Sequence, residues 1–370
     1  MQTQQWYWTP TLGWGEIGQN LSDADLVFIA ADTPYFYGAD CYSELRQRFP
    51  KACILGCSSA GNVLGARLSD QDMAITAVKF THSRVRLVAM DTEQSSDLLA
   101  LSKNLLATLQ EQGLRHIFIL SDGQKVNGSD LAKGFWEQEI AVSGGLAGDG
   151  TRFGATWVMA NAPARNGCIA ALGIYGDIQV RSTCFAGWHE FGTERIVTRS
   201  TGNIVMEIDG QPALTLYKKY LGNMAIDLPG SGLRFPLSVK LPNDDSKLVR
   251  TLLGIDEATQ SLRFAGDVPE GAICRLMRTQ LDDLVDSAAD AAKASLDGSD
   301  NPGLCLLVSC VGRRLVLGQM AEEELEAVQT ILGPNMSITG FYSYGELAPH
   351  GALMNCQLHN QTMTITTLRE

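Results

Sequence analysis

The sequence predicts a mixed α/β fold made of repeated βαβ units, and three observations lead to this prediction. Short apolar runs of strand length alternate with helical stretches, which is typical of βαβ units with buried, parallel strands. A small-residue turn that closes on glycine follows the second strand of each unit, and it occurs three times. Alternating strand-like segments follow each turn where a doubly wound fold would have a helix. We therefore expect repeated βαβ units with antiparallel strand extensions and a mixed α+β character.

Each unit has a strand, a helix and a returning strand, in this order. The expected elements are 26–32, 41–48 and 52–56 in the first unit, 116–122, 129–138 and 140–143 in the second, and 305–310, 320–332 and 337–340 in the third. Alternating segments follow at 73–91, 167–185 and 357–368, and we expect them to form antiparallel hairpins, the second turning at 175–177.

The three turns agree in their glycine and differ in the side chain that follows it. The aligned pairs are Gly61 with Asn62, Gly148 with Asp149, and Gly345 with Glu346. Asn and Asp readily cap their own turns, and we favour this interpretation for Asn62. For Asp149 and Glu346 a second interpretation stays open, since ligands of α/β sheets bind at the carboxyl ends of strands. The three loops are thus one candidate site.

A different stretch separates the second and third units. Residues 203–221 predict a strand, an Asp-Gly turn and a helix that begins near Pro212. Further strands are expected at 248–253, 260–264 and 272–278, before an acidic helix at 281–296. We place the domain boundary between these parts, giving an N-terminal extension at 1–25, one domain at 26–220 and another at 221–370.

Composition and charge exclude several classes of function. A net charge of -12 and a pI near 4.9 argue against nucleic-acid binding, which needs a basic face. The chain shows no signal peptide and no apolar run of membrane-spanning length, so we expect a cytoplasmic protein that does not bind membranes. Nine cysteines without a CxxC pair are expected to be reduced.

Catalysis is not expected. The run from Gly56 to Gly61 contains Cys57 but lacks the register of a nucleophile elbow, and no helix follows it. The second turn has neither serine nor cysteine in the corresponding columns. An enzyme that uses Cys57 is therefore the least favoured hypothesis, and we expect that the protein is not an enzyme.

Several motifs together resemble the FIST-domain family of sensory proteins. The motifs are GCSSAG, GGLAGDG, VTRSTGNIVMEIDGQPAL, SCVGRR, GFYSYGELAP and the closing HNQT. The resemblance covers nearly the whole chain in the expected order. It implies an N-terminal and a C-terminal FIST domain around a central pocket. It also implies a small-ligand sensor that acts in signal transduction through a partner, because no output domain is attached.

The resemblance leads to two versions of the ligand. In the leading version, the chain is similar to stand-alone NosP-type members, which bind haem, sense nitric oxide and control a histidine kinase. A single axial ligand would then be His189 or His359.

In the alternative version the ligand is an amino acid or a related polar metabolite. Asp149 and Glu346 would hold the ammonium group, and Arg313 would pair with the carboxylate in a bidentate manner. Tyr342 and Tyr344 would contact the apolar part, since alternate residues of a strand share one face.

Overall fold

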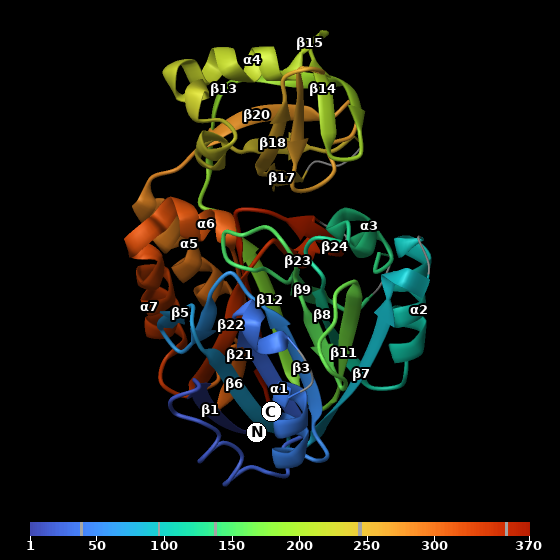
Figure 1. Cartoon of the computed structure of the whole chain (residues 1–370), viewed down its shortest axis with the longest axis vertical. Helices are drawn as coiled ribbons and strands as arrows, with labels where there is room; N and C mark the ends of the chain where they lie inside the picture. Colours follow the sequence, from blue (N-terminus) through green and yellow to red (C-terminus); the bar gives the residue numbers. More distant parts are fainter. Residues whose placement is uncertain (38–39, 95–96, 137–138, 243–245, 352–353) are drawn as a thin grey trace.

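The computed structural model describes residues 1–370 except 38–39, 95–96, 137–138, 243–245 and 352–353. Three mixed sheets and their helices form a core body, and a smaller second body of residues 189–278 lies at one end of it (Figure 1). The mixed α/β class predicted from the sequence is confirmed.

Each of the three predicted units forms a βαβ element with parallel strands. The elements are β2 (Leu26–Ala31), α1 (Asp40–Arg48) and β3 (Cys53–Ser58) in the first unit, β8 (Leu114–Ser121), α3 (Gly128–Lys133) and β9 (Val142–Leu146) in the second, and β21 (Gly303–Cys310), α6 (Val311–Leu317), α7 (Ala321–Leu332) and β22 (Met336–Ser343) in the third. The first strand of each unit also has an antiparallel neighbour. These neighbours are β6 (Met73–Lys79), β11 (Cys168–Gly176) and β25 (Met363–Arg369).

Three helices differ from the expectation. α3 ends at Lys133 because Gly134 caps it, and residues 137 and 138 of the longer predicted helix lie outside the described residues. α2 (Leu98–Leu109), which no sequence signal was assigned to, begins where the Asp97 carboxylate accepts a hydrogen bond from Ala100 N at 3.0 Å. α6 begins within the SCVGRR motif, directly after β21, which ends at Cys310.

The predicted antiparallel hairpins are wrong, because the two strands of each pair belong to different sheets. β7 (Ser83–Asp91) follows β6 but pairs with β11, and β12 (Gln179–Phe185) follows β11 but pairs with β25. β24 (Asn355–His359) pairs with β23 (Gly345–His350), while β25 pairs with β21 and β12. Alternation identified the strands, but it carries no information on which sheet receives them.

The strands that follow the three glycine turns are exchanged in the same cyclic way. Each turn sends its next strand to the returning strand of another unit. The pairs are β4 (Asn62–Leu64) with β22, β10 (Val158–Ala160) with β3, and β23 with β9. The three sheets therefore read β1-β6-β2-β3-β10, β7-β11-β8-β9-β23-β24 and β12-β25-β21-β22-β4-β5, with β1 (Gln2–Trp8) and β5 (Arg67–Ser69) at edges.

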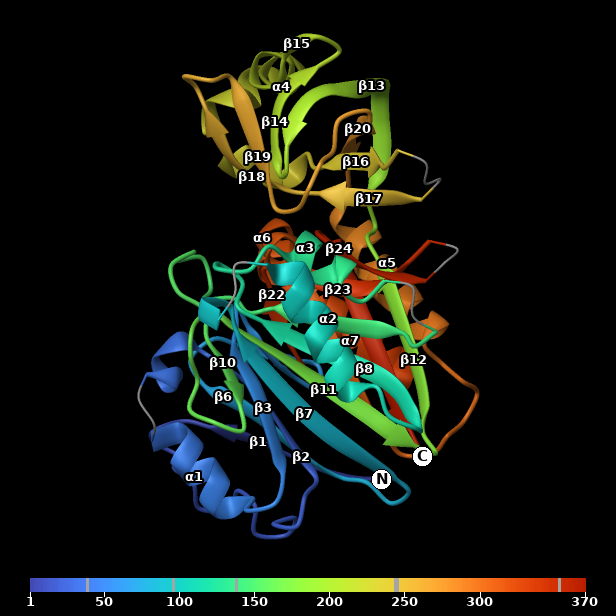
Figure 2. The ribbon, with the colours of Figure 1, turned by 90° about the vertical axis from the view of Figure 1, so that its right-hand side faces the viewer.

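The chain termini complete this three-fold arrangement. β1 takes the place in the first sheet that β7 and β12 take in the second and third. The amino group of Met1 lies 3.2 Å from the Glu370 carboxylate, so the two termini meet where the other units have a connection (Figure 2). The same carboxylate accepts hydrogen bonds from Thr81 N at 2.7 Å and His82 N at 3.0 Å.

The faces of the three sheets enclose one apolar core. Its buried side chains come from all three units, and the Phe28 and Phe118 rings meet edge to face at 6.0 Å between centroids. Burial of these side chains supplies the main driving force for folding.

The second body has its own sheet and its own core. Its elements are β13 (His189–Thr201), β14 (Ile204–Ile208), β15 (Gln211–Pro212), α4 (Ala213–Leu221), two short 3-10 helices η3 (Gly222–Asp227) and η4 (Gly230–Arg234), β16 (Leu237–Lys240), β17 (Lys247–Arg250), β18 (Leu252–Asp256), β19 (Ser261–Phe264) and β20 (Ile273–Arg278). α5 (Leu281–Ala294) then returns the chain to the core body. The domain boundary that we place at 220/221 from the sequence falls at the end of α4, inside this second body.

Candidate functional site

The three glycine turns lie together and are joined by backbone hydrogen bonds. The bonds run from Ala60 N to Tyr342 O at 2.8 Å, from Gly148 N to Ser58 O at 3.0 Å, and from Tyr344 N to Leu146 O at 3.0 Å. A Cβ atom at Gly148 would lie 2.9 Å from Ala60 N, so the approach of the first two turns requires glycine there. The strand exchange between units brings the three loops to one place.

A cavity of about 450 Å³ opens beside these turns. Its walls come from all three units and combine charged and polar side chains with apolar surface. The lining residues are Asp32, Ser59, Ala60, Asp70, Gln71, Gly150, Thr151, Arg152, Val311, Arg314, Leu315 and Gly318. We call this space the turn cavity.

Two ion pairs occupy the walls of the turn cavity. Arg314 pairs with Asp70 through two bonds of 2.6 Å each, and Arg152 lies 2.6 Å from the Asp32 carboxylate. Each pair joins different segments of the chain, and each is partly exposed. Partly exposed ion pairs contribute little to stability, so the exchange of one partner for a ligand group costs little.

Asp149 holds the loop that carries Arg152. Its Oδ2 accepts hydrogen bonds from Gly154 N at 2.8 Å and Ala155 N at 3.0 Å, and its Oδ1 accepts one from the Tyr344 hydroxyl. The Phe153 ring stacks on Tyr344 at 4.9 Å, and Phe153 has a φ of 50°, which is uncommon outside glycine. Burial, and then the bond to Asp149, raise the pKa of Tyr344.

The carboxylates that follow the glycines do not line the turn cavity. Asp149 is 2% exposed and bonds to its own loop, and Glu346 is fully buried. Glu346 accepts hydrogen bonds from Ser343 Oγ and Thr362 Oγ1, both at 2.7 Å. Burial raises the pKa of Glu346 to about 7. Both carboxylates thus have partners within the protein, and Glu346 binds Ser343 of its own turn as well as the distant Thr362. Asn62 likewise accepts a hydrogen bond from Ser59 Oγ in its own turn, and its amide donates to Asp72.

The predicted role of Arg313 as a carboxylate ligand does not fit its surroundings. Arg313 is fully buried, and its Nη2 lies 2.7 Å from the Glu324 carboxylate. All five of its N–H groups are occupied, by Glu324 twice, Ala186 O, Leu284 O and Ser287 Oγ. Tyr342 belongs to the same network, because its hydroxyl donates to Glu324 at 2.7 Å. Both residues stabilise the core.

The two histidines proposed as axial ligands lie outside the turn cavity. His189 is the first residue of the second body, and its side chain is 65% exposed. Its Nε2 atom lies 3.3 Å from the Asp283 carboxylate of α5. His359 is buried, its ring centroid is 5.0 Å from that of His350, and burial lowers its pKa to about 3. Its Nε2 atom has no hydrogen-bond partner within the part of the chain that the structure describes.

Sequence reasoning missed the four charged residues that line the turn cavity. Arg152 follows the GGLAGDG motif directly, and Arg314 is the neighbour of Arg313 in SCVGRR. Successive residues of a helix point about 100° apart, so α6 buries one arginine and directs the other at the cavity. Cys57, by contrast, lies within the central core, where burial raises the pKa of its thiol.

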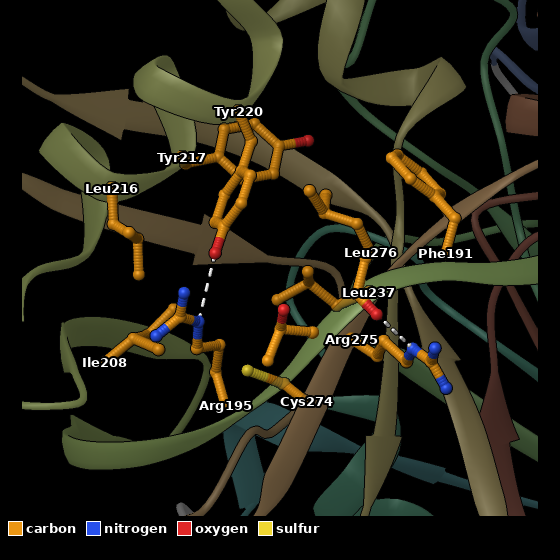
Figure 3. Close-up of a pocket in the computed structure, with 12 residues that line it drawn as sticks. Phe191, Arg195, Ile208, Leu216, Tyr217, Tyr220, Leu237, Cys274, Arg275 and Leu276 are labelled. Carbon is orange, nitrogen blue, oxygen red and sulfur yellow. Dashed lines mark hydrogen bonds between the residues drawn. The ribbon is translucent and has the colours of Figure 1, made fainter.

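A second, smaller cavity of about 40 Å³ lies in the second body (Figure 3). Its walls are apolar, formed by side chains such as Phe191, Leu216 and Leu276. Arg195 at its edge donates to the Tyr220 hydroxyl at 3.0 Å, and Arg275 donates to Gly192 O at 2.8 Å. Its volume is below the range of ligand pockets, so the turn cavity is the candidate site.

Comparison with models of protein families shows which family this chain belongs to. The FIST N domain matches residues 25–211 and the FIST C domain matches residues 213–349, so the chain belongs to the FIST family. FIST domains are associated with the sensing of small ligands in signal transduction. The two domain matches meet inside the second body, between β15 and α4.

Individual relatives are distant. Two uncharacterized proteins of Mycobacterium tuberculosis, from strains CDC 1551 / Oshkosh and ATCC 25618 / H37Rv, are each 27% identical over 225 residues, which is 57% of this chain. The match spans 58% of the length of these relatives. Among solved structures, a chorismatase aligns over 100% of this chain and 98% of its own, with 8% identity and a TM-score of 0.37. A cyanuric acid hydrolase from A. caulinodans aligns over 99% and 98%, with 6% identity and a TM-score of 0.37.

No helix among the described residues is long and apolar enough to cross a membrane.

Proposed function

We propose that this FIST protein senses a small zwitterionic metabolite, of the amino-acid class, that binds in the turn cavity. The observation that carries the proposal is the presence of two carboxylate–guanidinium pairs on the walls of one cavity of about 450 Å³. This volume lies within the range of small-molecule sites. The proposed sensor is cytoplasmic, is not an enzyme and passes its signal to a partner.

A zwitterion suits these walls because it can exchange partners with an existing ion pair. Its carboxylate replaces Asp70 on the Arg314 guanidinium, which already presents a bidentate geometry. The released Asp70 carboxylate then accepts the ammonium group. Every charge keeps a partner, so no unpaired charge is buried on binding.

Ligand-induced thermal stabilisation tests this proposal. A ligand that binds only the folded state at a hundred times its Kd stabilises it by about 2.7 kcal/mol. We expect one or more of the common amino acids to raise the melting temperature. Arg314→Ala should weaken the affinity about 10-fold to 100-fold, since hydrogen bonds to charged groups are worth about 1.5–3 kcal/mol.

Arg199→Ala is the matched control, because Arg199 pairs with Glu207 on the second body. It should leave the affinity unchanged. An amino-acid response that Arg314→Ala and Arg152→Ala both leave intact would place the ligand elsewhere, and the absence of any response would reject the ligand class.

Haem-dependent sensing of nitric oxide, with a histidine kinase as the partner, is the second candidate. The turn cavity does not fit haem, because its lining residues include no His, Cys or Met that could bind the iron. The observation in favour of haem is His359, whose buried Nε2 lacks a partner among the described residues and whose lowered pKa keeps the ring neutral.

An absorption spectrum after incubation with haem tests this candidate. A Soret band that His359→Ala removes and His189→Ala preserves would support it. A spectrum without a Soret band, or a band that neither variant alters, would reject these two histidines as axial ligands.

A further inference from the structure

One face of α6 forms part of the turn cavity. Val311, Arg314 and Leu315 of this helix line the cavity, and Gly318 follows directly after it. Arg314 is held by Asp70 and also donates to Ala60 O in the first glycine turn. Any ligand that replaces Asp70 on Arg314 therefore acts on α6.

The other faces of α6 contact the second body and its connection. Arg313 donates to Ala186 O, at 2.8 Å, in the segment that leads into the second body. Gly312 packs against Gln361 so closely that a Cβ atom would lie 2.7 Å from its Nε2. That same Nε2 donates to Leu233 O in η4 of the second body, at 3.0 Å. In Figure 1, α6 lies at the boundary between the two bodies.

The two connections to the second body lie next to each other. Thr279 Oγ1, after the second body, donates at 2.6 Å to Gly187 O, before it. Trp188 Nε1 donates to Gln361 O at 3.2 Å. Adjacent connecting segments with few residues are the usual form of a hinge.

An apolar cluster extends the contact from α6 to the second body. Leu317, the last residue of α6, belongs to a cluster with Trp188, Val249 and Met277. Val249 and Met277 are residues of the second body. A shift of α6 therefore reaches the second body through packed side chains as well as through Gln361.

Polar atoms at this boundary are not fully paired. Asn360 Oδ1 and Gln361 Oε1 are buried and have no donor within the described ranges. A buried acceptor without a donor costs free energy, so a shift at this boundary that brings a donor to either oxygen would recover that cost.

We infer that α6 transmits the occupancy of the turn cavity to the orientation of the second body, with Gln361 and Leu317 as the contacts. The inference rests on the proposed function for the identity of the ligand, but the coupling itself requires only that the Asp70–Arg314 pair be broken. The second body is then the part of the molecule whose position reports the ligand to a partner.

Hydrogen–deuterium exchange of the full chain without ligand tests the coupling. Asp70→Asn weakens the pair at the cavity end of α6, and we expect a change of about fivefold or more in exchange at 230–234 and 186–188, the lower end of typical allosteric coupling. Arg314→Lys serves as a second perturbation if Asp70→Asn folds poorly. Asp177→Asn, at an exposed position between β11 and β12, is the control and should change neither segment.

The route through Gln361 is tested by a double-mutant cycle. In a Gln361→Ala or Gly312→Ala background, Asp70→Asn should still change exchange around the cavity, but its effect at 230–234 should be smaller, because only the Leu317 contact remains. An effect of Asp70→Asn that is confined to the cavity would overturn the coupling, and an equal effect at 230–234 in both backgrounds would overturn the role of Gln361. Gly15→Ala, where a Cβ atom would also meet open space, is the glycine control.

A second arm with glycine as the added probe separates the two proposals. One outcome is that added glycine protects neither the residues around the turn cavity nor residues 230–234, while Asp70→Asn still changes exchange at 230–234. In that case the coupling holds, and glycine, or the whole amino-acid class, is rejected as the ligand. If glycine protects the cavity and leaves 230–234 unchanged, the ligand class holds and the coupling fails.

Discussion

Arg313 and Arg314 are consecutive residues with different partners. Arg313 pairs with Glu324 in the core, and Arg314 pairs with Asp70 at the turn cavity. The sequence identified the segment through the SCVGRR motif of the family resemblance. It could not say which arginine faces the cavity, since that depends on where α6 begins and on how it is rotated against α5 and α7.

Arg313→Ala is expected to lower the free energy of unfolding by about 3–5 kcal/mol, because it leaves the buried Glu324 carboxylate without its partner. Urea denaturation measures this loss. The ligand affinity of the folded fraction should stay unchanged. If the variant has normal stability but no longer binds the ligand, Arg313 belongs to the binding site and not to the core network.

Glu346 predicts a pH dependence of stability. Its pKa is about 7 in the folded protein and about 4.3 in an unfolded chain. Between these values the folded state binds more protons, so the contribution of Glu346 to the free energy of unfolding falls as pH rises from about 4.3 to about 7.

Glu346→Gln should remove this contribution. The difference in free energy of unfolding between wild type and variant is then expected to change across this pH window and to level off above it. Urea denaturation at intervals between pH 4.5 and 8 measures the difference. A constant difference over the whole range would show that the pKa of Glu346 is not raised.

At the scale of elements, the loop of residues 150–155 depends on one carboxylate. Asp149→Ala removes the acceptor for Gly154 N, Ala155 N and the Tyr344 hydroxyl. We expect faster cleavage by trypsin after Arg152, since its loop then opens more often. Limited proteolysis with mass spectrometry measures the rate, and Asp177→Ala is the matched control. Equal rates in wild type and Asp149→Ala would mean that other contacts hold the loop.

The elements also show what a single sequence can reveal about this fold. Most strands and the helices α1, α4, α5 and α7 were predicted, because their signals are local in the sequence. The partner of each strand was not, because β6 and β7 alternate in the same way whether they pair with each other or lie in two sheets. The sequence predicted that the three glycine turns form one site, which is where the turn cavity lies. It did not identify Asp32 and Asp70, because only the strand exchange brings their segments to the cavity.

At the scale of the whole molecule, charge is distributed unevenly. Residues 189–278 contain eleven Lys and Arg and eleven Asp and Glu, so the formal net charge of -12 resides entirely on the core body. A partner that approaches the second body meets a surface with little net charge. Salt should therefore affect its association rate less than it would at the core body.

The meeting of the termini predicts tolerance to circular permutation. A chain with 370 joined to 1 by a short linker and opened at 177/178 keeps every sheet, because that connection is equivalent to the gap between the termini. Circular dichroism and thermal melting should show a folded protein. A permutant opened at 310/311, between β21 and α6, should be clearly less stable, and equal stability of the two would argue against the equivalence.

The exchange of strands also has a consequence in time. β4 leaves the ribosome about 270 residues before β22, its partner in the sheet. At about 5–20 residues per second, this edge waits roughly 14–54 seconds for its neighbour. During that delay an unpaired edge is open to pairing with other chains. The architecture that gathers three loops around one cavity thus leaves the nascent chain dependent on protection until its last unit has been made.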